Sequence, residues 1–348
     1  RRTEISDVAG EVDIEDLIPL EECVITKTVN GYIKRLPADT YNVQNRGGRG
    51  ITGMTTREED SVENMFVCSS HDRIMLFSNL GRVYRIKAYE IPEGSRTAKG
   101  MNIVNVVPLM AGEKITVIIP VTDTDEDERY ICMITRKGII KRTKLSDFKN
   151  TRKSGIIAIS IDDGDELAHV RMTDGDNNLL VATKKGKAIH FNEHQVRSMG
   201  RTARGVKAIN MADDDTVVDM ALCKEDTRVL TVTETGYGRI SPISCYRLQS
   251  RGGKGLTNYR VEKYGDVAAT LPIEKNEDII MIASNGIVIR IFGDTISEFA
   301  RPAKGVRVMR VAEGERILSV AKAEHDETEV NDVPEAADAD AGAVEADE

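Results

Sequence analysis

The chain has 348 residues and 40% hydrophobic content, enough for a sizeable core, and its formal net charge is −9. It has no apolar run as long as a membrane-spanning helix, and its first residues do not have the pattern of a signal peptide. The five cysteines are odd in number and contain no C-x-x-C pair, which indicates reduced thiols of a cytoplasmic protein, packed mostly in strands. These features argue against a membrane protein and a disulfide-stapled secreted domain.

Each unit of the chain is predicted to contain four β-strands. In the second unit these are 61–69, 73–77, 82–86 and 101–107, with a hairpin across 78–81. The same order recurs around the glycines at 31, 138, 186, 236 and 286, with no helix-period segment of useful length. This pattern predicts an all-β fold whose sheets are arranged radially as blades. For the first blade, residues 14–20 and 316–322 compete for one strand position, so a closed ring and an open spiral are both compatible with the sequence.

A glycine-rich basic loop recurs about every fifty residues. Arg-x-x-(Arg/Lys)-Gly is found at 96–100, 201–205, 251–255 and 301–305, beside QNRGGRG at 44–50 and a shifted copy, TRKSG, at 151–155. This period predicts six repeated units rather than an enzyme fold with one cleft. Arginine and lysine among glycines can approach phosphates closely, so a polyanion-binding surface is expected. The predicted contact residues are Gln44, Asn45, Arg46, Gly47, Gly48, Arg49, Gly50, Arg96, Lys99, Arg152, Lys153, Arg201, Arg204, Arg251, Lys254, Arg301 and Lys304.

An acidic residue follows each basic loop by about ten residues: Asp60, Glu113, Asp165, Asp215, Asp266 and Glu315. Each is predicted to lie in a turn that leads from the fourth strand of one unit into the first strand of the next. Basic loops and acidic turns should therefore occupy different places, which lets a nearly neutral body present a positive stripe. No catalytic grouping stands out, and His190 and His194 have no evident third metal ligand, so neither catalysis nor a metal site is predicted.

Negative charge is concentrated near the C-terminal end. Residues 324–348 hold 11 of the 57 acidic residues and no Lys or Arg, which leaves 46 acidic against 48 basic residues in 1–323. This segment is rich in Ala and lacks aromatics, so it is predicted to be a disordered tail. Its carboxylates are predicted to regulate binding by competing with a polyanion for the basic loops. They are Glu324, Asp326, Glu327, Glu329, Asp332, Glu335, Asp338, Asp340, Glu345, Asp347 and Glu348.

The segment 44–50 matches six of the seven positions of the gyrase-A box, Q-R-R-G-G-(R/K)-G, with Asn45 in place of the usual arginine. A second near-match, QSRGGKG, lies at 249–255. With GYIKRLPADTY upstream of the box, the fifty-residue units and the acidic tail, residues 1–323 resemble the C-terminal domain of the bacterial DNA gyrase A subunit. The resemblance implies a six-bladed β-pinwheel, a propeller-like disc whose blades exchange strands and whose rim binds, bends and wraps double-stranded DNA without sequence specificity.

For a complete gyrase, a type IIA topoisomerase, the resemblance implies ATP-dependent negative supercoiling with Mg²⁺, a breakage-reunion domain and gyrase B subunits in an A2B2 assembly. Such an enzyme works in the bacterial cytoplasm, at the nucleoid. The fragment itself is expected to be a monomer with no cofactor, catalytic residue or membrane contact. Residues 1–13 are then a linker, 14–323 the pinwheel and 324–348 the tail. Two alternatives are the topoisomerase IV C-terminal domain, expected to lack a good box, and a protein-interaction propeller, which leaves the phased basic loops unexplained.

Overall fold

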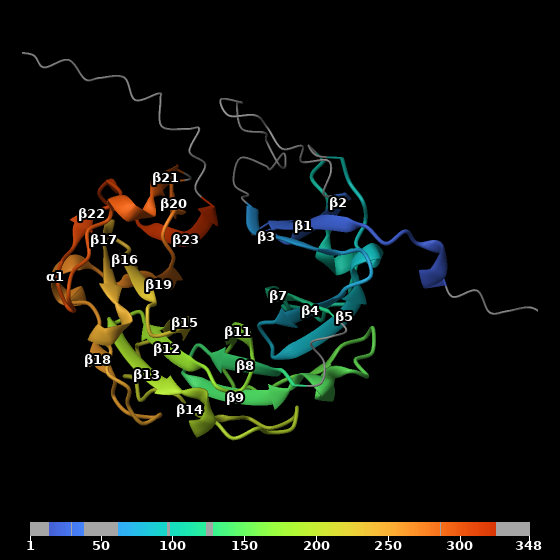
Figure 1. The fold of residues 1–348 in the computed structure, drawn as a ribbon, viewed down its shortest axis with the longest axis horizontal. Coiled ribbons are helices and arrows are strands. Elements are labelled where there is room, and N and C mark those ends of the chain that lie inside the picture. The colour runs from blue at the N-terminus through green and yellow to red at the C-terminus, as the bar shows by residue number, and fades with distance from the viewer. Residues whose placement is uncertain are drawn as a thin grey trace, which may run out of the picture.

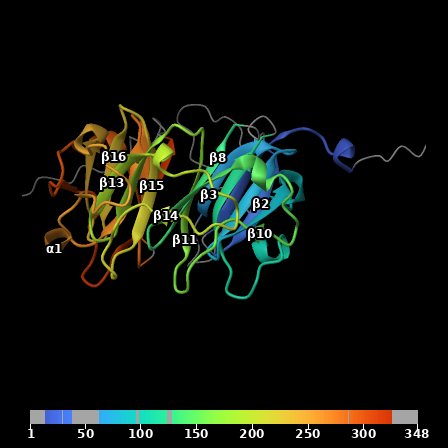
Figure 2. The same ribbon diagram turned by 90° about the horizontal axis from the view of Figure 1, so that it is seen from below.

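The computed structural model describes residues 14–28, 30–37, 62–95, 98–122, 128–285 and 287–324. Six antiparallel sheets stand around a central axis (Figure 1), and seen edge-on they form a disc (Figure 2). The predicted all-β architecture of six repeated blades is confirmed. The part of the chain that the structure describes has a single short α-helix, α1 (Val261–Tyr264), and its other helices are short 3-10 turns.

Each sheet is composed of the following strands, in spatial order. Sheet one is β3 (Val62–Ser69), β1 (Glu22–Thr28), β2 (Tyr32–Pro37) and β6 (Met101–Asn102); sheet two is β10 (Ile156–Ile157), β5 (Arg82–Lys87), β4 (Arg73–Ser78) and β7 (Ile115–Val121). Sheet three is β11 (Leu167–Thr173), β8 (Tyr130–Thr135), β9 (Ile139–Lys144) and β14 (Val206–Lys207); sheet four is β15 (Val217–Cys223), β12 (Asn178–Thr183), β13 (Lys187–Asn192) and β18 (Leu256–Thr257). Sheet five is β19 (Val267–Ile273), β16 (Arg228–Thr233), β17 (Tyr237–Pro242) and β22 (Val306–Arg307); sheet six is β21 (Val288–Phe292), β20 (Glu277–Ala283) and β23 (Ile317–Glu324).

Neighbouring units exchange a strand. The short strands β6, β10, β14, β18 and β22, which we call exchange strands, each pair with the outer edge of the sheet formed by the preceding unit. In sheet three, for example, Val206 of β14 pairs with Ile140 of β9. The exchange that the family resemblance implied is therefore present, and every described sheet except the sixth has an outer exchange strand.

The predicted grouping of strands into units was wrong in three places. Residues 62–69 form the innermost strand of sheet one, not the first strand of sheet two. The expected fourth strand, 101–107, is only two residues long before η4 (Ile103–Asn105), and it joins sheet one. Of the two segments expected to compete for sheet one, η1 (Ile14–Leu17) is a 3-10 turn and β23 pairs with β20 of sheet six. Local patterns locate strands, but pairing depends on partners distant in sequence.

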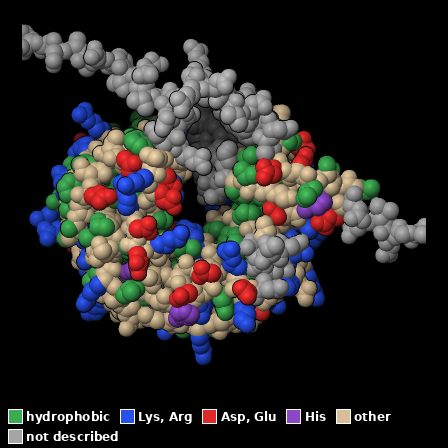
Figure 3. Space-filling view, viewed as in Figure 1, with side chains coloured by type: hydrophobic (Ala, Val, Ile, Leu, Met, Phe, Trp, Pro, Cys, Tyr) green, Lys and Arg blue, Asp and Glu red, His purple; other side chains and the backbone are tan. Residues whose placement is uncertain are grey.

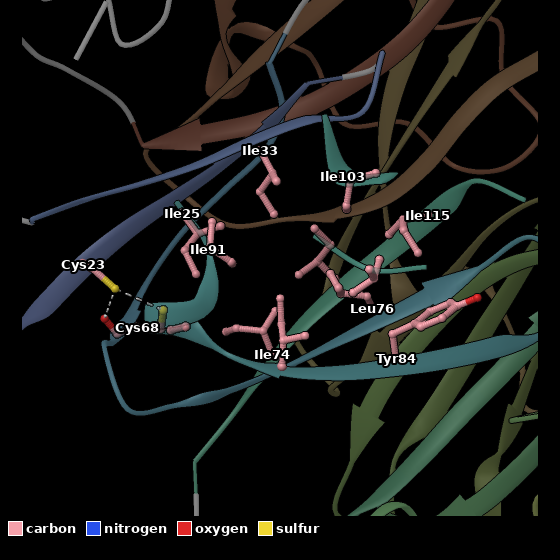
Figure 4. Close-up of a cluster of buried hydrophobic side chains, with 14 residues drawn as sticks. Cys23, Ile25, Ile33, Cys68, Ile74, Leu76, Tyr84, Ile91, Ile103 and Ile115 are labelled. Carbon is pink, nitrogen blue, oxygen red and sulfur yellow. Dashed lines mark hydrogen bonds between the residues drawn. The ribbon is translucent and has the colours of Figure 1, made fainter. Parts of the chain in front are cut away.

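Apolar side chains fill the spaces between neighbouring sheets from sheet one to sheet six, so each of sheets two to five packs against another sheet on both faces. This explains why middle strands such as β8 and β12 are buried along almost their whole length. Between sheets one and two, Ile25 and Ile33 meet Ile74 and Leu76 in one cluster (Figure 4). The predicted free thiols are also confirmed, and the four buried ones are Cys23, Cys68, Cys132 and Cys223.

Candidate nucleic-acid interface

The basic loops lead directly into the exchange strands, so they lie at the outer edges of sheets one to five. The loop ending at Gly100 precedes β6, and the loops ending at Gly155, Gly205, Gly255 and Gly305 precede β10, β14, β18 and β22. Lys and Arg side chains project at intervals from the margin of the disc (Figure 3). The predicted box residues 44–50, Arg96 and tail residues 325–348 lie outside the described residues, while Glu324 ends β23.

The glycine that closes each loop is required by the fold. Gly205 has a φ of +107°, and a Cβ added there would lie 2.6 Å from the carbonyl oxygen of Ile140 in β9. Gly100 and Gly255 also have positive φ values, and a Cβ added there would lie 2.7 and 2.6 Å from the carbonyl oxygens of Ile33 and Ala188. Only glycine accepts this conformation and this contact without strain. The recurring glycines therefore allow each described loop to pack closely against the third strand of its sheet. From the sequence, the same glycines were interpreted as allowing close approach to phosphates.

Two of these loops, and the segment just after β18, accept hydrogen bonds from a buried cation. Lys34 Nζ donates to the carbonyl oxygens of Ser95 and Ala98 at 3.2 and 3.0 Å. Lys141 Nζ donates to Ala158 O at 2.6 Å and to Arg201 O. The guanidinium group of the third, Arg239, donates to Asn258.

These three residues, which we call the inner cations, occupy equivalent positions in β2, β9 and β17 and are fully buried. Burial disfavours a charged amine, so it lowers the pKa of Lys141 to about 8 and also lowers the pKa of Lys34. Sequence reasoning missed them, although a basic residue three positions after a hairpin glycine was a visible signal.

The first arginine of two loops is also engaged inside the protein. The guanidinium of Arg251 donates to Gln195 O and Lys207 O, at 3.1 and 2.8 Å. That of Arg301 donates to Cys245 O and Thr257 O, both at 2.7 Å. Lys207 and Thr257 end the exchange strands of the preceding sheets, so these arginines tie successive loops together. Contact between Arg251 or Arg301 and DNA stays a prediction.

The remaining predicted residues differ in their surroundings. Lys153 is 82% exposed and forms an ion pair with Glu90 at 2.8 Å, and Arg204 forms one with Asp162. Arg152 and Lys254 are exposed and Arg201 is half-buried. Lys99 and Lys304 lie instead over tyrosine rings. We call the loop residues Lys99, Lys153, Arg204, Lys254 and Lys304 the outer cations.

The acidic turns of the described residues lie where the chain enters the innermost strands of sheets two to six, while Asp60 lies outside the described residues. Asp165 and Asp215 accept hydrogen bonds from the backbone N–H groups of Lys137 and Lys185, in the hairpin turns of their own sheets. Glu113 accepts one from the hydroxyl of Tyr84 at 2.6 Å. The predicted separation from the basic loops is incomplete, because Arg204 of one loop pairs with Asp162 at the start of the turn that holds Asp165. The structure adds that the carboxylates fix turns.

The two histidines considered as metal ligands have different surroundings. His190 is buried, with Nδ1 2.7 Å from Tyr246 O, whereas His194 is exposed and 3.0 Å from Asp176. In the described ranges, no group of three or more His, Cys, Asp or Glu residues is arranged to hold a metal ion. No helix within those ranges is long and apolar enough to cross a membrane.

A sequence model of the family described as "DNA gyrase C-terminal domain, beta-propeller" matches six segments: 24–69, 72–122, 129–174, 177–224, 227–274 and 277–324. The chain belongs to this DNA gyrase C-terminal domain family. Each matched segment contains the three long strands of one sheet, from the first hairpin strand to the innermost strand. The family's repeat therefore agrees with the sheets seen in the structure.

Relatives in sequence are A subunits of DNA gyrase. The DNA gyrase A subunit of Staphylococcus epidermidis (strain ATCC 12228 / FDA PCI 1200) is 44% identical over 327 residues, which cover 92% of this chain and 36% of the relative. The Staphylococcus aureus (strain MRSA252) protein of the same name is 42% identical over 337 residues, covering 95% and 38%. The chain thus spans little more than a third of the length of these curated relatives.

Solved structures of two kinds share the fold. A DNA topoisomerase IV C-terminal domain superposes with a TM-score of 0.78 and 26% identity, covering 89% of this chain and 96% of that one. A DNA gyrase A C-terminal domain superposes with a TM-score of 0.68 and 29% identity, covering 87% and 99%. The gyrase relationship in sequence is thus accompanied by a propeller shape common to both types of enzyme.

Proposed function

We propose that this chain binds double-stranded DNA along the outer edges of its sheets, bends it and wraps it with one handedness, without reading base sequence. The observation that carries the proposal is the recurrence of a basic residue in the loop that leads into the exchange strand of each of sheets one to five. Wrapping needs phosphate contacts repeated along a curved path rather than contacts to base edges.

The magnitudes favour many modest contacts over one strong site. Bending 20–30 base pairs through 40–90° costs on the order of 1–6 kcal/mol, so several loops must act together. If each of the five described loops neutralises about one phosphate, the slope of log K against log salt is on the order of −5. Isolated sheets should accordingly bind poorly.

In this proposal the chain works within a complete gyrase A polypeptide, beside its breakage-reunion domain and with gyrase B subunits in an A2B2 enzyme. The wrap presents a second DNA segment for strand passage that consumes ATP and uses Mg²⁺, so that negative supercoils are introduced in the bacterial cytoplasm, at the nucleoid. No catalytic step is assigned to the residues of this chain. The topoisomerase IV interpretation is kept as a second candidate, since the TM-score to that domain is 0.78.

The test is the topology of circular DNA bound to the isolated chain. Relaxed plasmid is incubated with the chain, treated with a nicking-closing enzyme, and freed of protein before the linking number is read on a gel. Chiral wrapping predicts a linking difference of one sign that grows with protein and disappears at high salt. Binding without a trapped linking difference would support the second candidate, and no binding at low salt would overturn both.

A further inference from the structure

Two outer cations are placed on aromatic rings instead of beside carboxylates. Lys99 Nζ lies 4.0 Å from the centroid of the Tyr32 ring, and Lys304 Nζ lies 4.2 Å from that of Tyr237. Within the described ranges neither lysine forms an ion pair. Each ammonium group therefore has a fixed position, and no described carboxylate compensates its charge.

The two arrangements are built in the same way. Tyr32 and Tyr237 are the first residues of β2 and β17, directly after a hairpin glycine, and each pairs with the second residue of the exchange strand, Asn102 or Arg307. In both cases the lysine lies three positions before that residue. The recurrence in sheets one and five, at the right and the left of the disc in Figure 1 with sheet six between them, indicates a recurring arrangement rather than one chance contact.

Sheets two, three and four lack the tyrosine at this position. They have Arg82, Ile139 and Lys187 there, as the first residues of β5, β9 and β13. Their loop cations are correspondingly different. Lys153 and Arg204 are paired with carboxylates, and Lys254 has no described ring beneath it. Part of the positive charge at the outer edges of sheets two and three is thus already neutralised by carboxylates.

In sheet five, a second cation also lies over the Tyr237 ring. Arg307 lies 4.9 Å from the Tyr237 centroid and donates a hydrogen bond of 2.6 Å to its hydroxyl oxygen. Tyr264 packs against Tyr237 with centroids 6.1 Å apart, and Tyr259 meets Tyr264 edge-on at 6.0 Å. This aromatic group holds Lys304 and Arg307 close together at the outer edge.

We propose that Lys99 on Tyr32 and Lys304 on Tyr237 are the principal phosphate grips of the wrapped DNA, with the tyrosines as positioning residues; this rests on the proposed function. A ring face attracts an ammonium group without cancelling its charge, and it limits the rotamers that phosphate binding would otherwise have to freeze. A carboxylate partner instead competes with the phosphate for the same cation. DNA should therefore be gripped most firmly at sheets one and five.

The first experiment maps lysine protection in the unmodified chain. The chain is acetylated with a short pulse of an amine-reactive ester, with and without a saturating plain duplex of about 150 base pairs, and modification is read at each lysine by mass spectrometry. We expect Lys99 and Lys304 to be protected at least fivefold and Lys153 less than twofold. Equal protection of all three would overturn the inference while leaving DNA binding intact.

The second experiment keeps the charge constant. Tyr32→Leu with Tyr237→Leu should weaken duplex binding about tenfold at 100 mM salt, because the lysines lose their ring support. Tyr32→Phe with Tyr237→Phe retains both ring faces and should restore affinity to within about twofold. Thermal unfolding of each variant shows whether the sheets are intact.

The outcomes separate the two proposals. If the Leu and Phe pairs bind equally, whether both like wild type or both weakly, the ring support is refuted. If the Leu pair fails to fold, the protection map decides alone. If the unmodified chain does not bind duplex DNA at low salt, the proposed function is wrong, and so is the assignment of Lys99 and Lys304 as phosphate-binding residues.

Discussion

Two sets of basic side chains lie on either side of the loops at the disc's outer edge. The inner cations, Lys34 and Lys141 among them, are fully buried and donate to backbone carbonyl oxygens beneath the loops. The outer cations come from the loops themselves, and two of them, Lys99 and Lys304, lie on rings. Both sets consist of Lys and Arg, and the difference is whether the charged group lies within reach of buried backbone carbonyl oxygens. A positive charge in this repeat is therefore buried beneath the loops or placed at the outer edge according to its position in the repeat.

The largest loss of stability should come from disrupting the close contact between a loop glycine and the third strand of its sheet. Gly205→Ala would force a positive φ on alanine and place its Cβ against the oxygen of Ile140, so we expect a loss of about 4 kcal/mol in the free energy of unfolding. Gly200 in the same loop has no atom within 4 Å of an added Cβ, so Gly200→Ala should cost less than about 0.5 kcal/mol. Urea unfolding of both variants measures the difference, and similar small losses would contradict the account.

The burial of the inner cations can be tested through the pH dependence of the free energy of unfolding. The pKa of Lys141 is lowered from 10.5 to about 8, so between these values the unfolded chain binds more protons than the folded one. Stability contributed by this group must therefore rise with pH across that window. Relative to Lys141→Met, wild type should gain about 3 kcal/mol from pH 7.5 to pH 10.5.

The measurement is urea unfolding of the two proteins at half-unit pH steps. Their difference cancels groups that titrate alike in both proteins, such as the tyrosines distant from Lys141. Parallel curves over the whole window would show that the Lys141 amine is not buried as a cation, and the distinction between inner and outer sets would lose its physical basis.

The smallest effect is expected at an outer cation paired with a carboxylate. Lys153 is 82% exposed, and its ion pair with Glu90 is screened by solvent, so Lys153→Gln should change the free energy of unfolding by less than about 1 kcal/mol. Glu90→Gln serves as the matched control from the other side of the pair. A loss comparable with that of Gly205→Ala would mean that outer cations also hold the fold together.

Much of the fold follows from local patterns. Hairpin glycines such as Gly138 and Gly186 have the positive φ values that their turns require, and the acidic turns at Asp165 and Asp215 lie where the period predicts. These features could be read from the sequence because a turn is decided by a few adjacent residues. The closing glycines were also found, but their reason, a close contact with a strand about 65 residues away, was not visible.

The sequence alone determined that this protein is a six-unit β-repeat with a basic loop in phase in each unit, because strand, turn and charge patterns are local. Only the tertiary structure decided which sheet each exchange strand completes, and hence which cations are buried and which face outward. The exchange strands have two residues each, too few to specify a partner through their own pattern, so pairing is fixed by contacts between neighbouring units. The tyrosine under Lys304 lies 67 positions earlier in the chain, and only folding brings the two together.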